Sequence, residues 1–87
     1  MSISPAPADP RAQNVQFTDE ELTVVLDDGR KIVVPLEWFP RLLFATHEQR
    51  FNWELLGDGA GIHWPDVGEY ISVAGLLRGA RSTEQRK

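Results

Sequence analysis

The sequence contains no cysteine, which excludes a disulfide-stapled scaffold and a zinc site with cysteine ligands. It also lacks any apolar run approaching the ~18 residues that a membrane-spanning helix needs. With 87 residues, the chain is too short for a large two-domain enzyme. We therefore interpret it as one small domain at most.

Positive charge is scarce in the middle of the chain. Residues 14–77 contain four Lys and Arg side chains against eleven Asp and Glu, a net charge of −7, whereas the whole chain has −4. This acidity argues against a nonspecific nucleic-acid binder, which normally presents a basic face. An acidic surface instead suits a basic protein partner, because complementary fields steer association.

The two ends of the chain differ in composition from the middle. Residues 1–13 hold three of the six prolines and almost no large apolar side chain, so we expect a flexible N-terminal tail. This segment lacks the features of a signal peptide, and we expect a cytoplasmic protein. Residues 80–87 are predicted to form a basic C-terminal tail, either a solvated terminus or a contact for an acidic partner or nucleic acid. A single domain is expected over residues 14–79.

Alternating apolar residues predict antiparallel strands between residues 15 and 35. Val15 and Phe17 alternate with polar neighbours, and the runs 22–26 and 31–34 flank Asp28-Gly29. This dipeptide is typical of a type I′ hairpin turn, in which both central residues adopt positive φ. We therefore expect two or three strands here.

Helical signals cluster in two places. Apolar residues recur at helical spacing over 37–45, where Pro40 suits the first turn of a helix. Thr46 and Gln49 have the spacing of a capping box, which predicts a second helical turn through Phe51. Ser72 is placed to cap a last helix, with Gly79 as the glycine beyond its C-terminus.

The segment between these helices predicts two more strands. Residues 52–57 and 62–64 are the expected strands, separated by turn-forming glycines, and Asp66 is expected to cap a turn over 66–70 with Glu69 at its third position. Together these elements predict the α+β class: a small antiparallel sheet of four to five strands with two to three short helices on one side.

Few residues carry recognisable chemistry. The glycines of residues 57–61 do not form a phosphate-binding loop, because no lysine follows and the segment leads into a strand. His63, Asp66 and Glu69 are three residues apart and form a candidate polar site, since a helix would place them on one face. Pro65 interrupts such a helix, and a strand would instead point His63 away from its two neighbours.

The chemical inventory therefore favours a non-enzymatic protein with no metal and no cofactor. Thr46 and Ser72 are better explained as helix caps than as nucleophiles. A minimal enzyme that uses the candidate polar site remains an alternative.

Large aromatic side chains are numerous for so small a domain. Six of them fall between residues 38 and 64, and a folded part of this size buries only about 60% of its unfolded surface. Phe39 and Trp64 are expected in the core, whereas some other rings should form an exposed patch of the kind that marks protein contacts. The predicted partner-binding residues are the two remaining tryptophans and the arginines beside them, because both residue types anchor interfaces: Trp38, Arg41, Arg50 and Trp53.

Several separated blocks of this sequence resemble the bacterial family called domain of unknown function 2442 (DUF2442). The blocks are Asp28-Gly29-Arg30, VPLEWFPRL from Val34 to Leu42, Ala45-Thr46, Glu48-Gln49-Arg50, Trp53, GDGAGIHWP from Gly57 to Pro65, and ISVAGLLRG from Ile71 to Gly79. The family usually has Asp-Glu-Asp before the last block, where this sequence has Gly68-Glu69-Tyr70. The loss of two acids puts in doubt any role that rests on that cluster.

The resemblance implies an α+β domain without assigned enzymatic activity. Many members look like partners of a second small protein, in gene pairs arranged like a toxin and its antitoxin. Some carry a helix-turn-helix domain after this one; the present sequence ends at Lys87, so we expect no direct nucleic-acid binding by that route.

These observations lead to a hypothesis and its main rival. We expect an interaction module that binds a protein partner, such as a small basic protein encoded nearby, and that forms a homodimer. The rival is a domain that senses a small molecule in a regulatory system.

Overall fold

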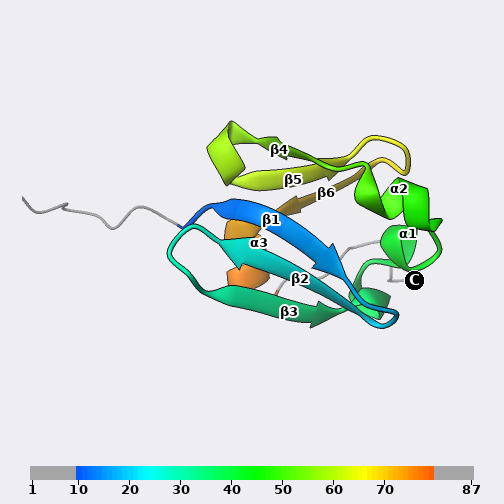
Figure 1. Cartoon of the computed structure of the whole chain (residues 1–87), viewed down its shortest axis with the longest axis horizontal. Coiled ribbons are helices and arrows are strands. Elements are labelled where there is room, and N and C mark those ends of the chain that lie inside the picture. Colours follow the sequence, from blue (N-terminus) through cyan, green and yellow to red (C-terminus); the bar gives the residue numbers. More distant parts are fainter. Residues whose placement is uncertain (1–9, 80–87) are drawn as a thin grey trace, which may run out of the picture.

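Two three-stranded antiparallel sheets, β1-β2-β3 and β4-β5-β6, form the body of the computed structural model, which describes residues 10–79 (Figure 1). The strands are β1 Ala12–Phe17, β2 Glu21–Leu26, β3 Lys31–Pro35, β4 Glu54–Leu56, β5 Gly61–Trp64 and β6 Glu69–Ser72. The α-helices are α1 Pro40–Leu43, α2 His47–Phe51 and α3 Val73–Leu77, and the 3-10 turns are η1 Leu36–Trp38 and η2 Gly57–Gly59.

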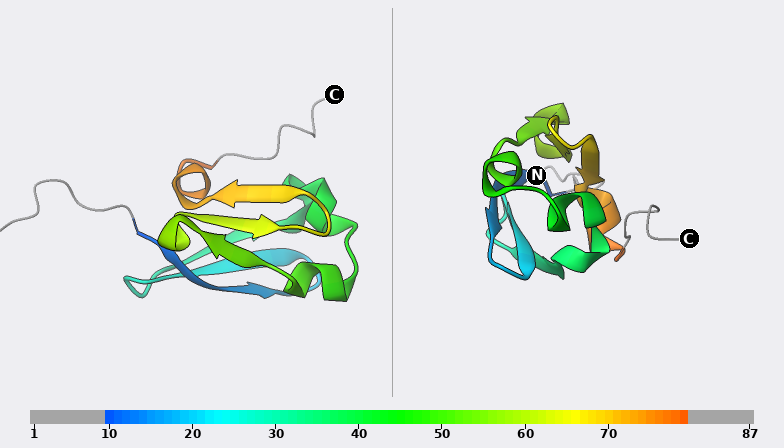
Figure 2. Two further views of the ribbon diagram at one scale, coloured as in Figure 1. Left: turned by 90° about the horizontal axis from the view of Figure 1, so that it is seen from above. Right: turned by 90° about the vertical axis from the view of Figure 1, so that its right-hand side faces the viewer.

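The predicted α+β class is confirmed, but the single sheet of four to five strands is wrong. The segment from η1 to α2 separates β3 from β4, so each group of three strands forms its own sheet. Residues 69–72 form β6 rather than part of a turn, because Gly68, at φ 69°, completes a tight turn that brings the chain back along β5. The helices do not cover one side: α1 and α2 lie at one end of the sheets and α3 lies toward the other (Figures 1 and 2).

The predicted domain boundary also moves. Ala12 and Gln13 belong to β1, and Ala12 is buried, so the inner end of the predicted tail is part of the sheet. Residues 1–9 of that tail and the basic C-terminal tail, residues 80–87, lie outside the described residues. None of the helices within residues 10–79 is long and apolar enough to span a membrane.

One apolar core joins the two sheets. The inner faces of β1, β2 and β3 contribute alternate residues, and β5, β6, α1 and α3 close the core from the other side. Trp64 of β5 is fully buried and is the largest such side chain among the described residues. Its ring meets Phe17 of β1 edge-on, with 6.3 Å between the centroids. Burial of these apolar surfaces is the main force that holds the sheets together.

The helix caps predicted from the sequence are present. Thr46 Oγ1 accepts from Gln49 N–H at 3.1 Å, and Gln49 Oε1 accepts from Thr46 N–H at 2.9 Å, which completes a capping box for α2. Ser72 Oγ accepts from the N–H of Gly75 at the start of α3. Gly79 has φ 80° just beyond α3, the conformation expected of a glycine there.

The β2–β3 turn differs in type from the prediction. Leu26 O accepts from Gly29 N–H and Leu26 N–H donates to Arg30 O, the pattern of a type I turn followed by a bulge with glycine in the left-handed region. Gly29 has φ 96°, whereas Asp28 does not have positive φ. The Asp28 carboxylate accepts from the Arg30 N–H at 3.0 Å and pairs with its guanidinium. The hydrogen bond from the Arg30 N–H is the largest of the interactions that lower the pKa of Asp28 below its ordinary value of 3.8.

We expect Arg30→Ala to leave part of this pKa depression in place, because the backbone N–H remains. Because the pKa is depressed, the ionised Asp28 stabilises the fold fully at pH values above its ordinary pKa of 3.8. This stabilisation is lost as the pH falls through the lower pKa of the folded state. Titration of the Asp28 carboxyl by NMR in both proteins measures the effect. A pKa that returns to its ordinary value in Arg30→Ala would assign the depression to the side chain instead.

The η2 loop packs its backbone against the start of β1. Gly57, Asp58 and Gly59 all have positive φ, and the guanidinium of Arg11 donates to the carbonyl of Gly57 at 2.9 Å. A Cβ atom on Gly59 would lie 2.6 Å from the carbonyl oxygen of Ala12. Gly59 therefore allows a close approach between the two backbones.

Gly59→Ala is expected to lower the free energy of unfolding more than Gly29→Ala. Both glycines have positive φ, of 99° and 96°, but a Cβ on Gly29 meets nothing within 4 Å. Gly29→Ala thus measures the conformational cost alone, about 1–3 kcal/mol, and Gly59→Ala adds the clash with Ala12. Urea unfolding followed by tryptophan fluorescence compares the two. Equal losses would contradict the tight loop packing.

Candidate functional site

The exposed aromatic rings are phenylalanines and a tyrosine, not the tryptophans. Phe44 is 82% exposed and Phe51 is 55% exposed. Trp38 and Trp53, predicted as exposed partner contacts, are instead half-buried and pack against the core. The reason lies in α1, which is one turn long and fully buries only Leu42, so that Phe44 at its end faces solvent.

Arg50 fastens α2 to α1. Its Nε donates to the Leu42 carbonyl and its Nη2 to the Leu43 carbonyl, both at 2.9 Å. These carbonyls belong to the last turn of α1, where acceptors lack the regular helical partner; the Leu42 carbonyl also accepts from the Ala45 N–H at 3.2 Å. Arg50 was predicted as an interface anchor, but its guanidinium is bonded inside the molecule.

Arg41 is also engaged within the domain. Its Nη1 donates to the carbonyl of Gly68 at 2.7 Å, which ties α1 to the turn between β5 and β6. The expectation that Arg41 and Arg50 flank exposed tryptophans is therefore wrong, because both tryptophans are half-buried. A role of Trp38, Arg41, Arg50 and Trp53 in partner binding stays a prediction.

Phe51 is held in place by its neighbours. The His47 ring lies 4.4 Å from it between centroids, and the Phe17 ring of β1 lies 6.4 Å away. The guanidinium of Arg50 sits 5.8 Å from the centre of the Phe17 ring, within the range of a cation–π contact. The exposed Phe51 ring of α2 thus rests against Phe17, which itself packs against the core.

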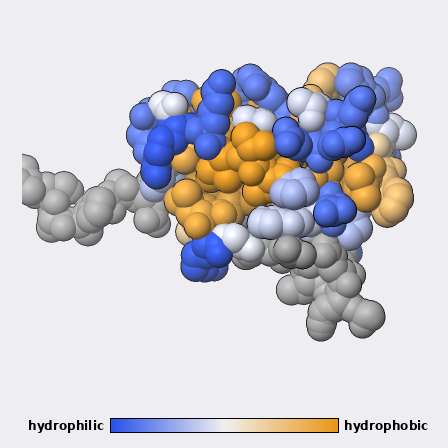
Figure 3. Space-filling view, turned by 90° about the horizontal axis from the view of Figure 1, so that it is seen from below, coloured by the Kyte–Doolittle hydropathy of each residue, from blue (hydrophilic) through white to orange (hydrophobic). Residues whose placement is uncertain are grey.

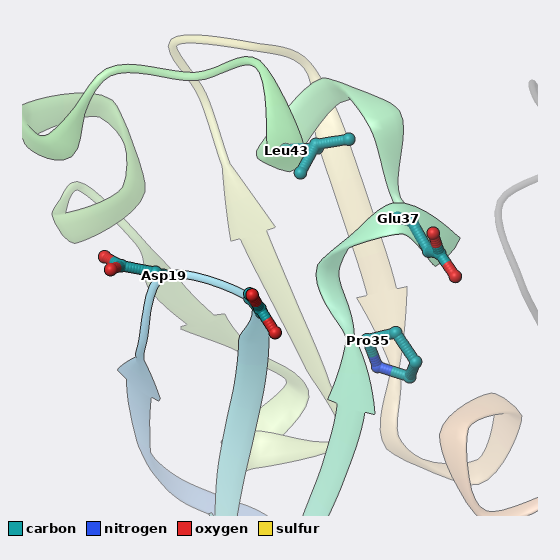
Figure 4. A pocket seen from close by; sticks show the side chains of 5 residues that line it. Asp19, Pro35, Glu37 and Leu43 are labelled. Carbon is teal, nitrogen blue, oxygen red and sulfur yellow. The ribbon is translucent and has the colours of Figure 1, made fainter.

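An acidic hollow of about 270 Å³ opens at the same end of the molecule. It lies between the β1–β2 turn, the end of β3, η1 and α1, and Figure 4 shows how these segments surround it. The lining residues are Asp19, Glu20, Pro35, Glu37 and Leu43. The lining thus combines three carboxylates with a proline and a leucine, and the side chains of Asp19 and Glu37 point away from each other (Figure 4). Sequence analysis missed this hollow because its walls come from distant parts of the chain.

The candidate polar site of His63, Asp66 and Glu69 is not assembled. His63 pairs with Tyr70 and Trp64 with Glu69 across the β5–β6 ladder, so His63 and Glu69 lie on opposite faces of the sheet. His63 Nδ1 lies 2.8 Å from Glu54 Oε2 on β4.

The two carboxylates of that trio have separate surroundings. Asp66 accepts from the Asn52 side chain at 3.1 Å and caps no helix. Glu69, the acid that this sequence keeps at 68–70, is only 7% exposed and lies in β6 rather than in a turn. No group of three or more His, Asp or Glu within residues 10–79 is arranged to hold a metal ion.

The comparisons with known proteins agree with this architecture. The model of the family "Protein of unknown function (DUF2442)" matches residues 12–82. The chain belongs to the DUF2442 family. No curated protein matches it.

Two solved structures have a fold similar to that of this chain. A protein of unknown function from Rhodospirillum rubrum is 27% identical, with a TM-score of 0.76 over 91% of this chain and 98% of that one. The uncharacterised protein CV0863 from Chromobacterium violaceum is 24% identical, with a TM-score of 0.71 over 83% of this chain and 68% of that one. The second likeness concerns the fold alone.

We predict that Arg50→Ala lowers the free energy of unfolding by about 1.5–3 kcal/mol, because two carbonyls lose a charged donor. Arg50→Lys should lose less, since one ammonium can still reach a carbonyl. The control is Arg78→Ala, because Arg78 is exposed and donates to Ala74 at 3.4 Å; a change within about 0.5 kcal/mol is expected there. Urea unfolding measures all three, and a neutral Arg50→Ala would refute the fastening role.

Proposed function

We propose that this chain is a non-enzymatic interaction module that binds a protein partner through one end of the domain. The end surface comprises the exposed ring that follows α1, the exposed rings of α2 and the acidic hollow beside them: Phe44, His47, Phe51, Asp19, Glu20 and Glu37. The observation that carries the proposal is the 82% exposure of Phe44. Exposed aromatic rings with charged neighbours are typical of interface centres.

Rigid presentation of this surface supports the proposal. The capping box fixes the start of α2, and the two bonds from Arg50 hold α2 against α1. The indole N–H of Trp64 donates to the Arg50 carbonyl at 3.0 Å, so that the core holds the far end of α2. A surface already held in one conformation loses little entropy on binding.

The hollow favours a basic partner. Its carboxylates can meet a guanidinium or ammonium group, while Pro35 and Leu43 offer an apolar surface for the aliphatic part of an Arg or Lys side chain. The net charge of −7 over residues 14–77 steers a basic protein toward the domain. We infer a cytoplasmic, antitoxin-like role in a two-gene pair from the family resemblance, with the neighbouring gene product as partner.

A small-molecule sensor is the second candidate. It would use the same hollow, whose volume of about 270 Å³ lies just below the ~300–1,000 Å³ usual for ligand pockets. Small cations would be the fitting ligands. The volume and the exposed rings beside it favour a protein partner over this alternative.

We expect Phe44→Ala to weaken binding of the neighbouring gene product by about 30-fold, the loss typical of a buried aromatic anchor. The experiment is co-expression of the two proteins and co-purification, followed by calorimetric titration. Glu20→Gln should weaken binding less and reduce its salt dependence. The matched control is Leu77→Ala on α3, an exposed apolar residue toward the other end of the domain, which should bind as the wild type does.

Two outcomes would contradict the proposal. If the neighbouring protein does not co-purify, the chain is not its partner. If it binds equally well to Phe44→Ala and Leu77→Ala, the end surface is not the interface. A rise in melting temperature with small cations, without protein binding, would favour the sensor instead.

A further inference from the structure

β3 forms one edge of the first sheet and has an exposed apolar residue at its centre. Within residues 10–79 it pairs only with β2. Its middle residues are Ile32, Val33 and Val34, and Val33 on the outer face is 51% exposed. Figure 3, which views the molecule from the side of β3, shows an apolar surface in the middle, bordered by hydrophilic residues.

The hydrogen-bond alternation determines which backbone groups of β3 point outward. Leu26 N–H donates to Arg30 O at one end of the β2–β3 pair, and Leu36 N–H donates to Glu20 O at the other. Antiparallel pairs alternate between bonded and non-bonded positions, so Ile32 and Val34 bond to β2. The amide groups of Lys31 and Val33 and the carbonyl of Pro35 then face the open edge.

We propose that two copies of this chain pair through β3, antiparallel, with the two-fold axis at Val33. Val33 of each copy would exchange N–H···O bonds with its counterpart, and each Lys31 N–H would donate to the carbonyl of Pro35 in the second copy. Pro35 has no N–H, so the ladder ends there. The result is one six-stranded sheet in a closed dimer. Each β3 edge is then paired, so no third copy can add to it.

The charges along β3 suit this arrangement and name the second copy as the occupant. Lys31 stands at one end of the strand and Glu37 follows Pro35 at the other, while Arg30 is paired with Asp28 within the same chain. An antiparallel pairing centred on Val33 puts Lys31 of each copy at the end of the strand from which Glu37 of the other copy follows, twice. A parallel pairing would instead place like charges side by side.

The other edge strands fit this role less well. β1 carries Gln13, Asn14 and Gln16, and its register is interrupted between Ala12 and Asn14. β4 has only three residues, Glu54–Leu56, too few for a stable ladder. Edge β6 begins with the buried Glu69 and is followed directly by α3.

In the proposed dimer Val33 lies on the two-fold axis, so its side chain faces Val33 of the second copy, and the test uses this contact. The wild-type chain of 9.8 kDa should sediment as a dimer. Val33→Lys alone, or Val33→Glu alone, should raise the dimer dissociation constant at least about tenfold, because two like charges then stand directly opposite each other. An equimolar mixture of Val33→Lys and Val33→Glu should form a heterodimer. Val33→Thr, which keeps the branched side chain, should stay dimeric.

A second variant tests the backbone. Val33→Pro removes the outward N–H and leaves the bonds to β2 intact, so it should be a folded monomer by circular dichroism. If it unfolds, the Lys and Glu variants still decide the matter. A wild-type chain that stays monomeric at millimolar concentration, or a mixture that fails to associate, would overturn the proposal. The dimer does not depend on partner binding: Phe44→Ala should leave the sedimentation unchanged.

Discussion

The hydrogen bond from the Trp64 indole to the Arg50 carbonyl, at 3.0 Å, is the contact on which the end of the domain depends. Trp64 is fully buried, and a buried indole N–H without an acceptor would be costly. The last turn of α2 must therefore lie where its carbonyl meets β5. The guanidinium of the same arginine then holds the last carbonyls of α1, so one residue connects the core, α2 and α1.

This arrangement uses arginine side chains to connect elements and leaves carboxylates in an open hollow. Arg11, Arg41 and Arg50 donate to backbone carbonyls of other segments, whereas the carboxylates at the β1–β2 turn and η1 line an open hollow. The arginines act as connectors between elements because a guanidinium can satisfy several acceptors at once. In the proposed interface, phenylalanine rings and carboxylates are then the groups left at this end to contact a partner.

Local signals predicted much of the fold. The alternation in β1, β2 and β3, the capping box of Thr46 and Gln49, and the cap at Ser72 each depend on residues only a few positions apart. The prediction failed at β6 and at the hairpin type. Residues 66–70 carry turn-forming residues, and only the pairing with β5 shows that Glu69 and Tyr70 continue as a strand.

The sequence by itself determined the class, the order of most elements and the position of their caps, because periodicity and capping act over one or two turns of chain. The tertiary structure decided which rings stay exposed, which arginines are occupied and which polar residues meet. Exposure of Phe44 depends on how short α1 is and how Arg50 holds it. The separation of His63 from Glu69 follows from strand register, since neighbouring positions along a strand face opposite sides.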